Sequence, residues 1–181
     1  MYIARIIPLF LVSFMKTILL VCSLAMSANV FSQKILSDTR DATTSMRTIT
    51  TGTNPLYKNS FSKTVDVQSQ LNVQNDSITS YDLDLISEEA TGNAPAVTAC
   101  SLEAENGTVI TGTSAETGNP KSFRFRFSKE DFYKMIALKI KQIKITTAEG
   151  REELIKINEN VQSTIANQAK VMLVRLRTGS N

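Results

Sequence analysis

The fold is decided by residues 121–157, KSFRFRFSKEDFYKMIALKIKQIKITTAEGREELIKI. Aromatic and basic residues alternate at its start, in the order Phe123, Arg124, Phe125, Arg126 and Phe127. Successive side chains of a strand point to opposite faces, so this pattern places rings on one face and guanidinium groups on the other. The stretch therefore predicts an antiparallel strand with one face in the core and the other in solvent.

A helix start follows this strand directly. Ser128 is a candidate N-cap, and Asp131 lies three positions later, where an acid suits both the cap and the helix dipole. Phe127 and Phe132 occupy the two positions of a hydrophobic staple. The sequence therefore predicts a short helix over residues 129–136.

The rest of the stretch predicts a hairpin. Residues 143–147 alternate apolar and polar side chains, AEGR at 148–151 is turn material, and residues 152–157 return as the partner strand. The apolar residues just before this hairpin are out of phase with those inside it, which predicts a loop or bulge near Lys141.

Alternation also predicts strands upstream, at 65–73, 78–86 and 97–105. The pair Asn106-Gly107 is a strong signal for a two-residue hairpin, with the chain returning over 108–112. After Asn158, a candidate N-cap, apolar residues recur every three or four positions and predict an amphipathic helix: Val161, Ile165, Ala169, Met172 and Leu176.

These elements predict one α+β domain over residues 63–181. We expect a mostly antiparallel sheet or sandwich of six to eight strands, one short helix, and a C-terminal amphipathic helix covering one face of the sheet. Residues 34–62 are rich in Thr and Ser, so we expect them to be weakly ordered or to form an edge strand, for which residues 46–50 are the candidate.

Residues 1–33 have the character of a signal peptide. They contain two basic residues and no acid, and Lys16 divides two apolar runs that are each shorter than the roughly 20 residues of a membrane span. Residues 1–14 are then an extension upstream of a start at Met15. We expect cleavage after Ser32, with Ser27 as the alternative, and an exported chain in the periplasm, at the cell surface or outside the cell. A lipid anchor at Cys22 and a retained membrane anchor are less favoured.

The residue inventory excludes several kinds of site. The chain has no histidine, and only Cys100 remains after the signal peptide, so His-activated nucleophiles and His- or thiolate-ligated metal sites are excluded. No phosphate-binding loop or other cofactor motif is present. We therefore expect no catalytic, metal or cofactor residues, a buried Cys100, and no stable transmembrane span in the mature chain.

Charge is distributed unevenly along the chain. Residues 34–120 carry 5 basic and 11 acidic side chains, whereas residues 121–144 carry 8 basic and 2 acidic ones. Two interpretations stay open: a basic face around Arg124 and Arg126 that binds a partner or an anion, or cross-strand pairing of these arginines with acids. Nucleic acid is not an expected partner, because the mature chain is nearly neutral overall.

Two further features carry candidate chemistry. Glu103 and Glu105 lie two apart on one strand face and are the only pair we consider for a carboxylate-based hydrolase, although two such acids beside a turn are commonly just solvated. The triplet Asp76-Ser77-Ile78 is similar to the acceptor of a general O-glycosylation system of Bacteroidota, which makes Ser77 a candidate modification site.

The chain resembles small exported proteins of Bacteroidota. The resemblance lies in the ending of the signal peptide at residues 30–33, the strand and helix cap at 123–132, the hairpin at 140–150, and the terminal helix. It implies an antiparallel β domain closed by a C-terminal helix. It brings no catalytic residues, because these proteins have no assigned activity.

The sequence thus favours an exported, non-enzymatic envelope or cell-surface protein that binds a protein or glycan partner through the face of Arg124 and Arg126. The alternatives are a periplasmic hydrolase that uses carboxylates such as Glu103 and Glu105, and a purely structural envelope component.

Overall fold

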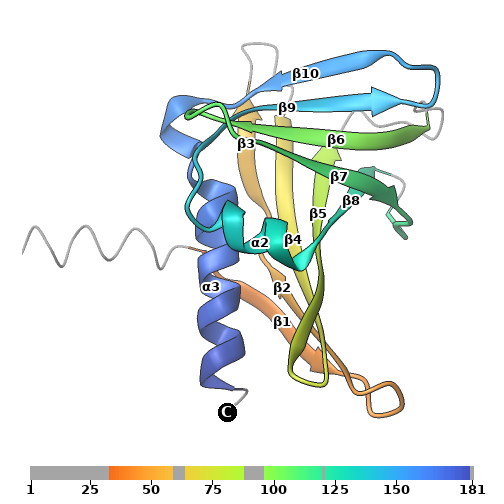
Figure 1. Cartoon of the computed structure of the whole chain (residues 1–181), viewed down its shortest axis with the longest axis vertical. Helices are drawn as coiled ribbons and strands as arrows, with labels where there is room; N and C mark the ends of the chain where they lie inside the picture. The colour runs from red at the N-terminus through yellow and green to blue at the C-terminus, as the bar shows by residue number, and fades with distance from the viewer. Residues whose placement is uncertain (1–32, 59–63, 88–95, 120, 180–181) are drawn as a thin grey trace, which may run out of the picture. The chain divides into compact units, whose positions relative to one another are not determined.

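The structure is a computed structural model that describes residues 33–58, 64–87, 96–119 and 121–179 (Figure 1). By its internal contacts the chain divides into two units, Met1–Gln33 and Lys34–Asn181, and all elements below belong to the second. The predicted cleavage site after Ser32 and the extension 1–14 lie outside the described residues. No helix in the described part has the length and hydropathy of a membrane span.

Ten strands of the described chain form one antiparallel sheet in the order β1-β2-β4-β5-β8-β7-β6-β9-β10, and β3 also pairs with β4. The strands are β1 (Ile35–Arg40), β2 (Met46–Thr51), β3 (Asn54–Lys58), β4 (Thr64–Gln74), β5 (Ser77–Ser87), β6 (Val97–Ala104), β7 (Val109–Ala115), β8 (Ser122–Phe127), β9 (Ile140–Thr147) and β10 (Glu152–Lys156). The helices are α2 (Lys129–Met135), the 3-10 helix η2 (Glu159–Val161) and α3 (Thr164–Thr178).

The predicted fold class is confirmed: the protein is α+β, with an open antiparallel sheet, one short helix and one C-terminal helix. The expected number of strands was too low, because the Thr- and Ser-rich segment contributes β1 and β3 in addition to the candidate strand at residues 46–50. The strand expected at residues 46–50 is β2, but β1 pairs with its outer side and takes the edge position.

Local predictions around α2 and β9 are confirmed. The Ser128 hydroxyl accepts a hydrogen bond from the Asp131 amide at 3.1 Å and caps α2. Opposite β6 the register shifts from Glu103 facing Gln142 to Ala104 facing Ile140, so the bulge lies at Lys141.

The C-terminal helix begins later than the sequence indicates. Asn158 caps η2 without a side-chain bond, and α3 starts at Thr164. The reason is a backbone tie: the Gln162 carbonyl accepts from the Ile140 amide at 3.0 Å. This bond uses the carbonyl to anchor the chain beside β9 before the longer helix begins.

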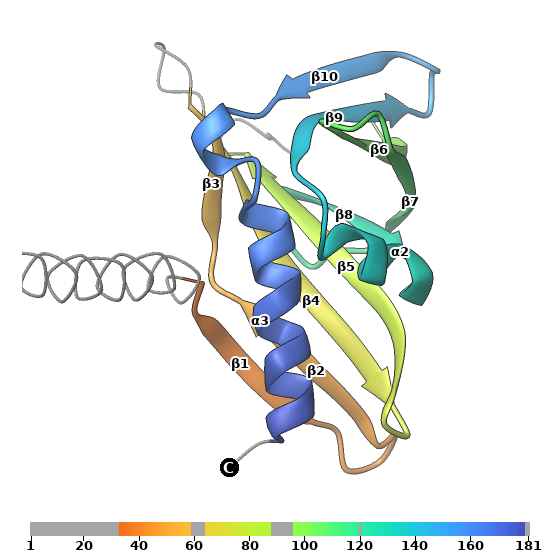
Figure 2. The same cartoon turned by 60° about the vertical axis from the view of Figure 1, so that its left-hand side comes forward.

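The sheet bends strongly, so that β6, β9 and β10 run across the direction of β2, β4 and β5 (Figures 1 and 2). Helices α2 and α3 lie on its inner side, where α3 contacts β2 and β4 and α2 contacts β5. Large, fully buried side chains from the sheet and α2 fill the space between: Ile49, Leu71, Tyr81, Leu83, Phe125, Phe127 and Phe132. The phenylalanine face of β8 is therefore the core face, as its alternation predicts.

A buried polar network fixes α3 on this inner face. Gln168 is fully buried; its amide nitrogen donates to the carbonyls of Gly52 and Val67, both at 3.3 Å. Its amide oxygen accepts from the Ser69 hydroxyl at 2.6 Å, and that hydroxyl is also 2.6 Å from the Tyr81 hydroxyl. The helix is thus held at one height on β4 by bonds that a purely apolar contact lacks.

An ion cluster ties the edge of the sheet to the end of α3. Asp38 of β1 accepts two hydrogen bonds from Arg47 of β2, at 2.9 and 2.8 Å, and one from Arg175 of α3 at 2.6 Å. Its carboxylate is only 7% exposed. The hydrogen bonds from Arg47 are the main reason that the pKa of Asp38 lies below its ordinary value.

We predict that Asp38→Asn lowers the free energy of unfolding by about 1.5–3 kcal/mol at pH 7, because hydrogen bonds to a charged group are lost. A carboxyl whose folded pKa is depressed stabilises the fold above its unfolded pKa of about 3.9, and this contribution disappears as the pH falls through the folded pKa. The difference between variant and wild type should therefore shrink below about pH 4. Urea unfolding at several pH values measures it, with the exposed Glu116→Gln as control; a pH-independent difference would contradict the prediction.

A close approach of β7 to the core makes a second prediction. A Cβ placed on Gly112 would lie 2.6–2.9 Å from the ring of Phe127, a side chain that is almost fully buried. Gly112→Ala should therefore destabilise the protein by about 1–3 kcal/mol through overpacking. Gly118→Ala is the matched control, because a Cβ there meets nothing within 4 Å. Equal urea midpoints for the two variants would show that the ring can move aside.

Candidate functional site

The outer face of the sheet pairs both arginines of the sequence motif with acids. Because β8 is antiparallel to β5, Arg124 faces Asp84 and Arg126 faces Asp82. Each guanidinium donates from two nitrogens to two carboxylate oxygens, at 2.7 Å for both bonds of the first pair and 2.9 Å for both of the second. Such bidentate bonds are among the stronger ones in proteins. Cross-strand pairing, one of the two interpretations of the charge pattern, is present here.

The two members of the second pair differ greatly in exposure. The Asp82 carboxylate is fully buried, whereas the Arg126 side chain is 53% exposed. On its other side Arg126 faces the small Thr113 of β7, which leaves the guanidinium open to solvent. The hydrogen bonds to Asp82 raise the pKa of the Arg126 guanidinium. Binding of a partner or an anion by Arg124 and Arg126 stays a prediction, and any ligand would meet guanidinium groups that are already neutralised.

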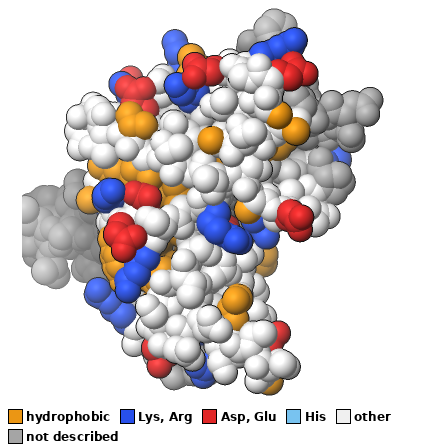
Figure 3. Space-filling view, turned by 45° about the vertical axis from the view of Figure 1, so that its right-hand side comes forward, with side chains coloured by type: hydrophobic (Ala, Val, Ile, Leu, Met, Phe, Trp, Pro, Cys, Tyr) orange, Lys and Arg blue, Asp and Glu red, His pale blue; other side chains and the backbone are white. Residues whose placement is uncertain are grey.

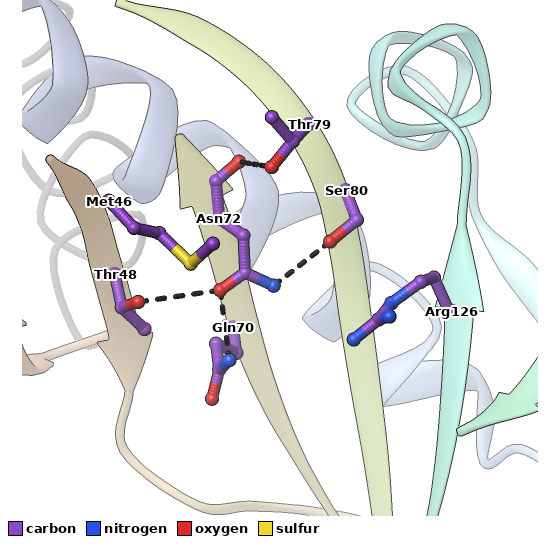
Figure 4. A pocket seen from close by; sticks show the side chains of 7 residues that line it. All are labelled: Met46, Thr48, Gln70, Asn72, Thr79, Ser80 and Arg126. Carbon is purple, nitrogen blue, oxygen red and sulfur yellow. Dashed lines mark hydrogen bonds between the residues drawn. The ribbon is translucent and has the colours of Figure 1, made fainter. Parts of the chain in front are cut away.

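Asn72 of β4 connects Asp82 to the neighbouring strands, and Figure 4 shows its side-chain bonds to Thr48, Gln70 and Ser80. Its amide nitrogen donates to the Ser80 hydroxyl at 2.9 Å and to Asp82 at 3.1 Å. Its amide oxygen accepts from Gln70 at 3.0 Å and from the Thr48 hydroxyl at 3.4 Å. An amide has two donors and about two acceptor positions, so the side chain of Asn72 is fully used.

Asn72 and several of its neighbours line an open hollow of about 400 Å³ on the outer face of the sheet. Four neighbouring strands supply its lining, which includes Met46 and Thr48 from β2, Gln70 and Asn72 from β4, Ser80 from β5, and Arg126 from β8. The volume is within the range of roughly 300–1,000 Å³ found for ligand sites. Figure 3 shows one face of the molecule, on which uncharged surface predominates and basic and acidic groups are small and intermixed.

The remaining sequence candidates lie elsewhere. Glu103 pairs with Lys141 at 2.6 Å and accepts from Gln142, and the bond from Lys141 is the main reason that its pKa is lowered. A general acid in glycoside hydrolysis needs the opposite shift. Glu105, in the turn after β6, is 3.7 Å from Lys139. Each acid therefore has its own lysine partner, and the hydrolase reading gains no geometric support at this pair.

Ser77 is exposed at the first position of β5. The preceding Asn75 and Asp76 both have positive φ, as a tight two-residue turn requires. The hydroxyl is 3.4 Å from Lys129 Nζ. The candidate O-glycosylation site is thus on an accessible hairpin tip, and modification there stays a prediction.

Cys100 is fully buried in β6, as the sequence predicts. Burial raises the pKa of its thiol to about 12. Within the described part of the chain, no group of three or more potential metal ligands was found.

Sequence reasoning missed Thr48, Gln70, Asn72 and Ser80. Polar residues at outward positions of strands are ordinary, so no local signal distinguished these four from other solvated side chains. Comparison of the chain with protein-family models, curated proteins and solved structures found no match.

The ion pair beneath the hollow makes a prediction. Arg126→Met should lower the free energy of unfolding by about 2–3 kcal/mol, because it leaves the buried Asp82 without its charged hydrogen-bond donor. The double variant Asp82→Asn/Arg126→Gln removes both charges and keeps amide groups in place, so it should recover most of that loss. Chemical unfolding of both variants checks this. Equal destabilisation would mean that the unpaired charge of Asp82 is not the cause of the lost stability.

Proposed function

We propose that this protein is an exported, non-enzymatic envelope or cell-surface protein that binds a protein or glycan partner. The binding surface is the outer face of β2, β4, β5 and β8. The observation that carries the proposal is the hollow of about 400 Å³ on this face, lined by hydrogen-bonding side chains from four strands. Export rests on the sequence of residues 1–33 alone.

The organisation of this face supports a binding role. Its arginines are held in fixed positions by bidentate bonds to Asp82 and Asp84, and Asn72 is held by four hydrogen bonds. Side chains that are already ordered lose little further freedom when a partner binds, which favours affinity. Hydrogen bonding, and not catalysis, is the chemistry that such a rigid and neutralised surface offers.

Crosslinked capture from the native envelope tests the proposal. The variant is Arg124→Gln/Asp84→Asn combined with Arg126→Gln/Asp82→Asn, which removes both guanidinium groups without leaving a buried acid unpaired. The control is Lys144→Gln/Glu152→Gln, which removes another cross-strand ion pair, 2.9 Å long, between β9 and β10. We expect a partner that the wild type and the control capture and that the variant captures at least tenfold less.

Folding of all three proteins is verified first by circular dichroism and urea unfolding. Equal recovery by the variant would place the binding surface elsewhere. If no protein captures a partner, the binding role is wrong and a structural role in the envelope is favoured instead.

A further inference from the structure

The floor of the hollow is saturated with hydrogen bonds, but its rim is not. Asn72, in the floor, uses both donors and both acceptor positions. Around it, hydrogen-bonding groups remain without a partner among the described residues. They include the Ser80 hydroxyl hydrogen, the amide oxygen Oε1 of Gln70 and the third nitrogen Nη1 of Arg126. Donors and acceptors are thus interspersed around one small opening.

The charge of the hollow is balanced. Among the described residues that line it, Arg126 is the one with a charged side chain, and its guanidinium is bound to both oxygens of Asp82. An anionic ligand would gain little net attraction here, because the carboxylate offsets the guanidinium. A neutral ligand, in contrast, brings no charge of its own that would lose its hydration on binding, and the charge of Arg126 is already compensated by Asp82.

One apolar surface borders these polar groups. Met46 is 37% exposed, and its flexible thioether side chain lies at the edge of the hollow on β2 (Figure 4). A ligand with hydroxyl groups on its rim and C–H groups on its face would satisfy both kinds of surface. Hydroxyl groups also act as donor and acceptor at once, which matches the mixed set at the rim.

We propose that the hollow lined by Met46, Thr48, Gln70, Ser80 and Arg126 is a binding site for a neutral carbohydrate. This inference rests on the proposed binding function and narrows its partner from a protein or glycan to a glycan without acidic groups. Vicinal hydroxyls bond to Gln70, Ser80 and Nη1 of Arg126, and the C–H face of the sugar ring lies against Met46.

A panel of immobilised oligosaccharides tests the site directly. It contains neutral glycans ending in glucose, galactose, mannose or N-acetylglucosamine, and acidic glycans ending in a uronic acid. We expect the purified protein to bind at least one neutral glycan. Gln70→Ala and Thr48→Val, tested separately, should each weaken that binding about three- to tenfold, as expected for loss of one hydrogen bond or disturbance of one rim group.

Thr50→Val is the matched control. Thr50 is on the same strand and the same outer face as Thr48, is equally half-buried, and does not line the hollow. It should bind like the wild type. Binding that is equal in all three variants would overturn the proposed location. Binding of acidic glycans alone, or of no glycan on the panel, would overturn the proposed ligand class.

Periodate treatment separates this inference from the proposed function. Periodate cleaves vicinal diols, so an envelope treated with it should lose capture by the wild-type protein if the partner is a glycan. Capture that survives periodate and still depends on the two arginine pairs would overturn the carbohydrate and leave a protein partner for the same face. If the wild-type protein captures no partner from an untreated envelope and binds no glycan on the panel, both proposals are wrong.

Discussion

The pairing of β5 with β8 is the contact on which the rest of the structure depends. Residues 81–85 of β5 and 123–127 of β8 alternate strictly, so one register places aromatic and aliphatic side chains together on the inner face and oppositely charged side chains together on the outer face. A shift of β8 by one residue against β5 would turn Arg124 and Arg126 into the core and Phe125 and Phe127 to the outer face. The apolar core and the polar outer face therefore enforce the same register.

On the inner face, this register positions the side chains that contact both helices. Phe127 and Phe132 lie on either side of the Ser128 cap, and the rings of Tyr81 and Phe132 are 5.3 Å apart. The Tyr81 hydroxyl then reaches the network of Ser69 and Gln168, which holds α3. One strand pair thus positions α2 through packing and α3 through hydrogen bonds. The bend of the sheet places these helices on its concave side (Figure 2).

Sequence reasoning succeeded where the decisive contacts are local. The β8 strand, the Ser128 cap and the bulge at Lys141 each follow from residues within a few positions of one another. The strands β1 and β3 were missed, and β2 was predicted only as a candidate edge strand, because this segment carries few large apolar residues. Strands β2 and β3 are held by pairing with β4, up to about 30 residues away in the chain, and β1 by pairing with β2. The order of the sheet, with β8 between β5 and β7, likewise has no local signature.

In the candidate site too, local features were predictable and long-range contacts were not. Alternation predicted that Arg124 and Arg126 share a face, but their exact partners depend on the long-range register with β5. No sequence signal marked Asn72, because its role depends on four hydrogen-bond partners that come from three strands.

The Asn72 side chain and its hydrogen-bond partners are ordered when the sheet forms. Their side-chain conformational entropy is therefore lost in folding and not in binding. In the proposed carbohydrate complex, the remaining contacts would be a few hydrogen bonds, each replacing one to water and each contributing about 0.5–1.5 kcal/mol. Such a surface suits weak recognition of a single sugar unit. Tight attachment would follow from repetition of that unit along a glycan or an array of these proteins, because linked binding events raise the effective concentration without any new contact.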